Sequence, residues 1–90
     1  MRPTGRTLDA KSFAAGVGEA VRRARQSRGW TQAELAERAG LSPNYVARLE
    51  RGELGPSLLV AHMLCDTLEI AVSELLQAPS ARTTRRRALG

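Results

Sequence analysis

Apolar residues recur along this 90-residue chain at the three- and four-residue spacing of helices. From Phe13 they fall at positions 13, 17, 20, 21 and 24, which share one face of a helix. A second run is expected to face inward and comprises Leu58, Ala61, Leu64, Cys65 and Leu68. No segment alternates apolar and polar residues with a period of two, so the pattern predicts an all-α fold.

Polar capping residues mark where the predicted helices begin. Thr31 is followed three residues later by Glu34, the spacing of a capping box in which each side chain accepts from the other residue's backbone amide. Trp30 and Leu35 flank this cap at the spacing of a hydrophobic staple. The other predicted caps are also short polar residues: Asp9 or Ser12, Ser42 and Ser57. With a short last helix at about 74–77, these starts predict five helices.

Two of the predicted helices, Gln32–Ala39 and Pro43–Arg51, are joined by only three residues. A link this short makes the helices cross sharply instead of running antiparallel. Gly40 opens the link, and glycine enters the left-handed backbone region at a helix end at little cost. Ala36 lies where the two helices come closest, and a larger side chain would wedge them apart. The spacing therefore predicts a helix-turn-helix.

The positive charge of the chain is concentrated at its two ends. The net charge is +5, but residues 1–11 carry +2, residues 78–90 carry +4 and residues 12–77 carry −1. A high isoelectric point is therefore no evidence by itself for nucleic-acid binding. We expect a flexible arm at 1–11, a domain at 12–78 and a disordered basic tail at 79–90. The arginines of the tail either clamp DNA phosphates or only keep the chain soluble.

Several classes of function lack the residues that they need. A single cysteine, Cys65, cannot form an intrachain disulfide, which fits a reducing, cytoplasmic compartment. His62 lies three residues before Cys65, but the sequence has no further histidine or cysteine to complete a zinc site. No set of residues resembles a nucleophile with its base, so we expect no enzyme, no cofactor and no metal. No apolar run reaches the roughly 20 residues of a membrane span.

Residues 17–76 resemble the phage-repressor/Cro-type (XRE-like) helix-turn-helix family. The matching stretches are VGEAVRRARQSRGWTQAELAERAGLSPNYVARLERGELGPSL and LEIAVSELL, in which small, apolar, capping and glycine positions all agree. The resemblance implies a compact five-helix bundle of the lambda-repressor type. It also implies that the third helix enters the DNA major groove, usually in a homodimer on a two-fold symmetric operator with half-sites about 34–36 Å apart.

The resemblance assigns roles to residues at the matching positions. Base contacts fall on four residues of the third helix, which are Pro43, Asn44, Tyr45 and Arg48. Phosphate contacts fall on Gln32, Ser42 and Arg51. Arg48 and Asn44 suit base edges, since arginine pairs with guanine O6 and N7 and asparagine with adenine N6 and N7. Arg25 and Glu50 match a structural ion pair that joins the first and third helices of the family.

Two positions depart from the family pattern, and a third leaves two roles open. Pro43 stands where relatives often carry a polar base-reading residue, so it offers only an apolar contact. Glu53 stands where the family often has lysine or arginine. Repulsion between its carboxylate and the DNA phosphates therefore replaces a phosphate contact, and the expected affinity for DNA is lower. Tyr45 suits either a phosphate or a thymine methyl group.

Two hypotheses of function follow. The first is a sequence-specific regulator of transcription, expected to be a repressor, which binds double-stranded DNA as a homodimer and blocks or positions polymerase. The second is a protein-interaction module with the same fold, either an antitoxin-like protein that binds a partner or an adaptor that does not bind DNA. The sequence leaves the operator, the effector and any protein partner open.

Overall fold

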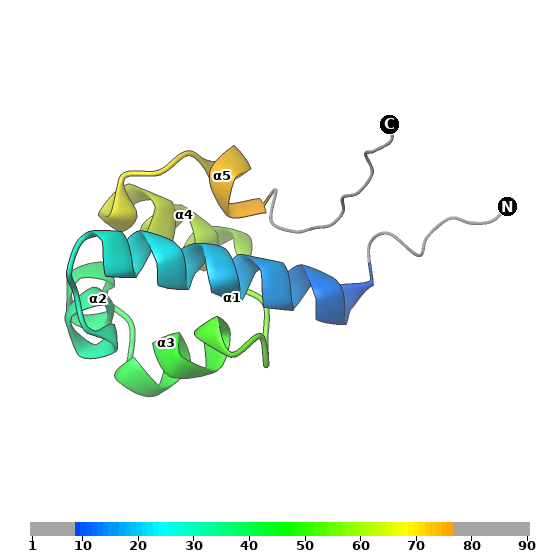
Figure 1. The fold of residues 1–90 in the computed structure, drawn as a ribbon, viewed down its shortest axis with the longest axis horizontal. Helices are drawn as coiled ribbons and strands as arrows, with labels where there is room; N and C mark the ends of the chain where they lie inside the picture. Colours follow the sequence, from blue (N-terminus) through cyan, green and yellow to red (C-terminus); the bar gives the residue numbers. More distant parts are fainter. Residues whose placement is uncertain (1–8, 77–90) are drawn as a thin grey trace, which may run out of the picture.

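The computed structural model describes residues 9–76, which form five helices and no strands (Figure 1). The helices are α1 (Ala10–Ser27), α2 (Gln32–Ala39), α3 (Pro43–Glu50), α4 (Leu58–Leu68) and α5 (Val72–Leu76). The prediction of an all-α, five-helix bundle with a central helix-turn-helix is confirmed. α1 begins at Ala10, within the range expected for the N-terminal arm. Residues 1–8 of that arm and the basic tail at 79–90 lie outside the described residues.

The first four helices begin at polar residues that the sequence indicates. A backbone amide three residues further on donates to each cap, and the caps are Asp9, Thr31, Ser42 and Ser57. Asp9 is thus the cap of α1, and this bond from the Ser12 amide lowers the pKa of its carboxyl group. Glu34 in turn accepts from the Thr31 amide at 2.8 Å, which completes the capping box. These bonds fix the residue at which each helix enters the bundle.

The core is aliphatic and draws on all five helices. Its largest fully buried side chains are Leu35, Leu49, Leu64, Leu68, Leu75, Val17, Val21 and Val46. The prediction that Leu58 faces inward is wrong, because 89% of its surface is exposed. Leu58 is the first residue of α4, and the buried residues of that helix begin only at Ala61, one turn later. The first turn of α4 therefore extends past the core.

α1 and α3 approach so closely that only a glycine fits between them. A Cβ atom on Gly18 would lie 2.3 Å from the backbone oxygen of Leu49 and 2.9 Å from that of Glu50. From the sequence alone, Gly18 is only a residue that weakens a helix by about 1 kcal/mol relative to alanine. In the structure it is the point where the two helix backbones meet, so it determines how α3 lies against α1.

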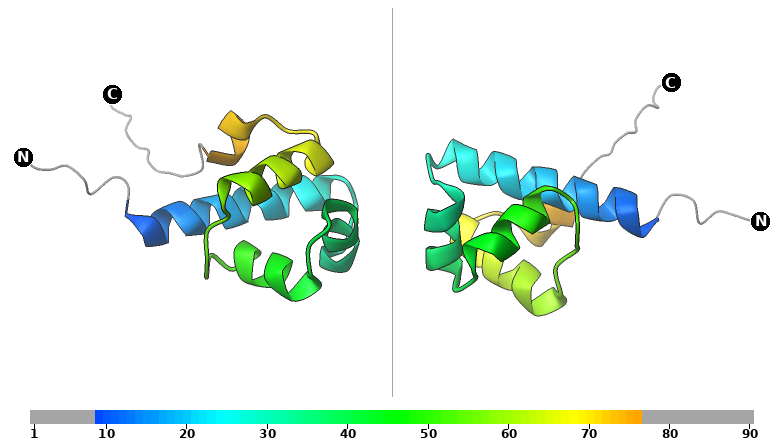
Figure 2. Two further views of the ribbon diagram at one scale, coloured as in Figure 1. Left: turned by 180° about the vertical axis from the view of Figure 1, so that it is seen from behind. Right: turned by 90° about the horizontal axis from the view of Figure 1, so that it is seen from below.

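The helix-turn-helix lies at one side of the bundle. Gly40 has a φ of 75° at the end of α2, and the chain then turns directly into α3. Figure 1 shows α3 below α1 and α5 above it, as does the left view of Figure 2. Pro43, Asn44 and Arg48 are exposed, so one surface of α3 is free of the other helices.

Candidate nucleic-acid interface

α3 turns one face to the core and the other to solvent. Val46 and Leu49 are fully buried, whereas the predicted base-contacting residues Pro43, Asn44 and Arg48 are exposed. Tyr45, the fourth of these predicted residues, is half-buried and packs against the core. Its burial raises the pKa of its hydroxyl group still further above neutral, and the protonated hydroxyl is a hydrogen-bond donor.

The predicted phosphate-contacting residues lie at the ends of α2 and α3. Ser42 caps α3, and its hydroxyl oxygen accepts from the Tyr45 amide at 3.0 Å, which leaves the hydroxyl proton free to donate. Gln32 is the first residue of α2, and its Nε2 donates to Glu50 Oε1 at 2.9 Å. Arg51 is the C-cap of α3 and is exposed.

A buried carboxylate joins the three helices that form the site. Glu50, with 2% of its side chain exposed, accepts from Arg25 Nε at 2.7 Å and from Arg25 Nη2 at 3.0 Å. These bonds, which raise the pKa of Arg25, form the ion pair that the sequence predicts between α1 and α3. Arg25 Nη1 also donates to the Trp30 carbonyl at 2.7 Å. With Gln32 as the third contact, Glu50 ties α3 to both α1 and α2.

A second carboxylate lies on the exposed side of the site. Glu53 accepts from Arg51 Nε at 2.6 Å and from Arg48 Nε at 3.2 Å. The bond from Arg51, and after it the bond from Arg48, holds the pKa of the Glu53 carboxyl below its ordinary range. From the sequence, Glu53 is expected only to repel DNA phosphates, and these two contacts with arginine are not predicted. The two contacts span two and five residues across the end of α3, where the regular spacing of three and four residues does not apply.

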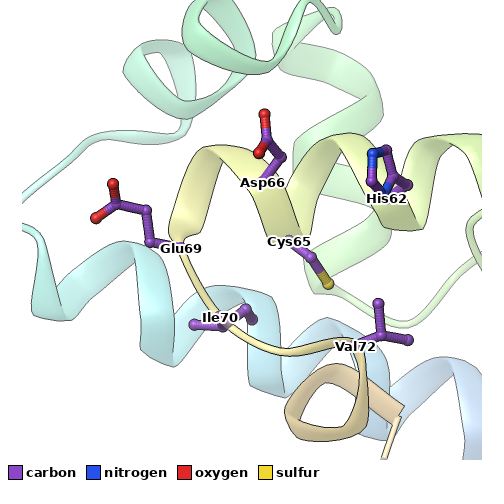
Figure 3. Close-up of a pocket in the computed structure, with 6 residues that line it drawn as sticks. All are labelled: His62, Cys65, Asp66, Glu69, Ile70 and Val72. Atoms are coloured by element: carbon purple, nitrogen blue, oxygen red, sulfur yellow. The ribbon is translucent and has the colours of Figure 1, made fainter.

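An open depression of about 390 Å³ lies between α4 and the segment that leads to α5 (Figure 3). Its lining residues are His62, Cys65, Asp66, Glu69, Ile70 and Val72. Burial raises the pKa of the Cys65 thiol, which disfavours the thiolate that a metal would need. Within residues 9–76, no three histidine, cysteine or acidic side chains gather as a metal-binding group. Among the described helices, none combines the length and the apolar character that a membrane span requires.

The sequence of the helix-turn-helix matches a known family over most of the described residues. The model of the HTH_3 family, described as helix-turn-helix, matches residues 21–75. The chain belongs to the HTH_3 family. The family match therefore agrees with the resemblance that the sequence motifs indicate and with the helix-turn-helix in the structure.

The relatives of this HTH_3 chain include transcription regulators. It is 38% identical over 60 residues to the immunity repressor protein of Bacillus phage phi105, a match that covers 67% of this chain and 42% of that protein. It is 33% identical over 73 residues to the transcriptional regulator ClgR of Mycobacterium tuberculosis, a match that covers 81% of this chain and 65% of ClgR. The chain thus spans less than two thirds of the length of both relatives.

A solved structure extends the likeness to three dimensions. The HTH_3 chain superimposes on the restriction-modification controller protein C.AhdI from Aeromonas hydrophila with a TM-score of 0.66 and 34% sequence identity. The match covers 69% of this chain and 94% of the controller protein. The likeness therefore includes nearly the whole of that controller protein.

Proposed function

We propose that this chain is a sequence-specific regulator of transcription that binds double-stranded DNA with α3 in the major groove. The observation that carries the proposal is the outward face of α3. Pro43, Asn44 and Arg48 are exposed there, on a helix whose other face is held to α1 and α2 by buried contacts. A helix presented in this way fits the major groove, which is about 12 Å wide. The relatives named as a repressor and a transcriptional regulator support the same function.

Each exposed residue of α3 has a chemistry that suits a base edge. In the proposed complex, Arg48 donates two hydrogen bonds to guanine O6 and N7, and Asn44 pairs with adenine N6 and N7. Pro43 contributes an apolar contact to a thymine methyl group, and Tyr45 contacts a thymine methyl group or a phosphate. These contacts give the complex its sequence preference.

The residues at the helix ends set the register of the protein on the DNA. Gln32 and the N-terminus of α2 face a phosphate, since the first amides of a helix and its dipole favour an anion. The free hydroxyl proton of Ser42 and the guanidinium of Arg51 donate to further phosphates. Such contacts add affinity without sequence preference.

We further propose that the protein acts as a homodimeric repressor on a two-fold symmetric operator, in the cytoplasm, where it excludes polymerase and needs neither catalysis nor a cofactor. The apolar surface of α5 supports a dimer, because Val72 and Leu76 are 46% and 42% exposed. α5 and α3 lie in different parts of the molecule (Figure 1), so a second copy bound at α5 would not cover the α3 of either copy.

In-vitro selection from a random duplex library tests this function, with the affinity of the enriched site measured against salt concentration. We expect a palindromic site bound at least about 10³-fold more tightly than random DNA. Enrichment without a palindrome would contradict the homodimer but not the base reading. Weak, salt-sensitive binding to all sequences alike would contradict the function as a whole.

The exposed apolar residues at the start of α4 favour a second candidate function. Leu58 and Leu59 are 89% and 68% exposed, which suits the binding of a protein partner. An antitoxin-like protein or an adaptor with this fold would use such a surface. Failure of the DNA selection, together with loss of partner binding on Leu58→Ser and Leu59→Ser substitution, would favour this candidate over the DNA regulator.

A further inference from the structure

Glu53 contacts both exposed arginines of the proposed DNA-binding face, and the function proposed above gives it no role. One carboxylate oxygen accepts from Arg48 Nε at 3.2 Å and the other from Arg51 Nε at 2.6 Å. We propose that Glu53 is a specificity-determining residue, which positions Arg48 for base reading and weakens binding to DNA that lacks the matching base. The inference rests on the proposed function and assigns a further residue to the same site.

The geometry of the contact leaves the reading end of Arg48 available. Glu53 engages Arg48 through Nε, and no hydrogen bond joins the terminal Nη1 and Nη2 atoms to any residue that the structure describes. Those two terminal groups suit an end-on, two-bond contact with guanine O6 and N7. An arginine that is already held in one geometry loses less conformational freedom when it binds. Glu53 therefore lowers the cost of ordering Arg48 on the correct base.

The charge of Glu53 weakens the attraction to phosphates, which is nearly all of the affinity for random DNA but only part of the affinity for the target. Residues 12–77 carry a net charge of −1, so the domain attracts phosphates weakly. Glu53 partly neutralises Arg51, the nearby candidate for a phosphate contact, and the bond from Arg51 lowers the pKa of this already ionised carboxyl further below neutral. Binding to random DNA depends almost entirely on attraction to phosphates. A carboxylate on this face therefore lowers the affinity for random DNA, whereas base contacts still support binding to the target.

The Glu53→Gln variant of the full chain tests the inference. Glutamine keeps the size of the side chain, but it has no charge, and it offers one acceptor oxygen where the carboxylate offers a separate oxygen to each arginine. Dissociation constants are measured for the selected site, for that site with the guanine replaced, and for a random duplex. The guanine is the base pair at which Arg48→Ala relaxes the preference. We expect tighter binding to the random duplex and a specific-to-random affinity ratio that falls by about 2- to 12-fold.

Glu19→Gln is the matched control on α1. Glu19 also bridges two arginines, Arg22 and Arg23, at 3.2 and 3.3 Å, and its side chain is 46% exposed against 44% for Glu53. The control removes the same charge from a different surface, so we expect the affinity ratio to stay unchanged. An equal fall in the ratio for both variants would overturn the inference, because net charge alone would explain it.

The remaining outcomes separate this inference from the proposed function. If the unaltered chain enriches no sequence, the proposed function fails and the role of Glu53 fails with it. If the unaltered chain is specific and Glu53→Gln keeps the ratio or leaves random binding unchanged, only the inference fails.

Glu53→Asp separates positioning from charge. Aspartate retains the charge but is one methylene shorter, so it cannot reach both Nε atoms in the present geometry. We expect Glu53→Asp to bind random DNA with the same affinity as the unaltered chain does. Its preference for the guanine should be weaker. A preference equal to that of the unaltered chain would overturn the positioning role.

Discussion

Two arginine–glutamate contacts involve α3 and the turn that follows it, one on the inner side that faces the core and one on the outer side that faces solvent. On the inner side, Glu50 accepts from Arg25 at 2.7 Å with only 2% of its side chain exposed. On the outer side, Glu53 accepts from Arg51 at 2.6 Å with 44% exposed. The bond lengths are nearly equal, but water and salt screen the outer contact and have little access to the inner one. Exposure, not distance, therefore indicates which contact stabilises the fold and which is available to a ligand.

The largest expected effect comes from removing the inner carboxylate. Glu50→Ala leaves the Arg25 guanidinium buried without its partner and should lower the free energy of unfolding by about 3–5 kcal/mol. This is a large part of the roughly 5–15 kcal/mol that stabilises an ordinary domain. Urea denaturation followed by circular dichroism measures the loss. Glu53→Gln should leave the unfolding midpoint unchanged, and an equal loss in both variants would contradict the distinction between the two sides.

Adding one methyl group between α1 and α3 tests the inner side in a different way. Gly18→Ala should lower the free energy of unfolding by about 1–3 kcal/mol, although alanine favours a helix by about 1 kcal/mol. The added Cβ atom meets the backbone oxygen of Leu49, which cannot move without shifting α3. Gly55→Ala is the control, because its Cβ atom would have no neighbour within 4 Å. Thermal denaturation that shows a stabilised Gly18→Ala variant would refute the close approach of the two helices.

On the outer side, Arg48→Ala should change DNA binding and leave stability alone. We expect a loss of about 1–3 kcal/mol in binding free energy on the preferred site, with a relaxed preference at one base pair. Fluorescence anisotropy with single-base variants of the site measures both effects, and thermal denaturation should give the same midpoint as the unaltered chain. Equal weakening on all sequences would mean that Arg48 contacts phosphate and reads no base.

Features that depend on neighbours within a few residues could be predicted from the sequence. The capping box of Thr31 and Glu34 and the left-handed turn at Gly40 follow from local chemistry and appear in the structure. The Arg25–Glu50 contact spans 25 residues, and the resemblance to a family predicted it. Long-range contacts can thus be predicted where a family pattern supplies them.

Features that depend on where the core ends, or on contacts without a family pattern, could not be predicted. The spacing of apolar residues indicates the inner face of α4, but it does not show that the core stops short of Leu58. The bond between Gln32 and Glu50 joins residues 18 positions apart, and the contact of Gly18 with Leu49 depends on how two helices cross. These features come from tertiary packing, which periodicity does not encode.

The close approach at Gly18 positions α3 through backbone atoms, and the exposed side chains of α3 take no part in it. Leu49 and Glu50 meet α1 through their carbonyl oxygens, and positions 43, 44 and 48 contribute nothing to the buried core. Residues at those three positions can therefore be exchanged while the helix stays in place. A duplicated copy of such a gene can acquire a new target without first rebuilding its fold, and a library randomised at these positions gives an engineer the same freedom.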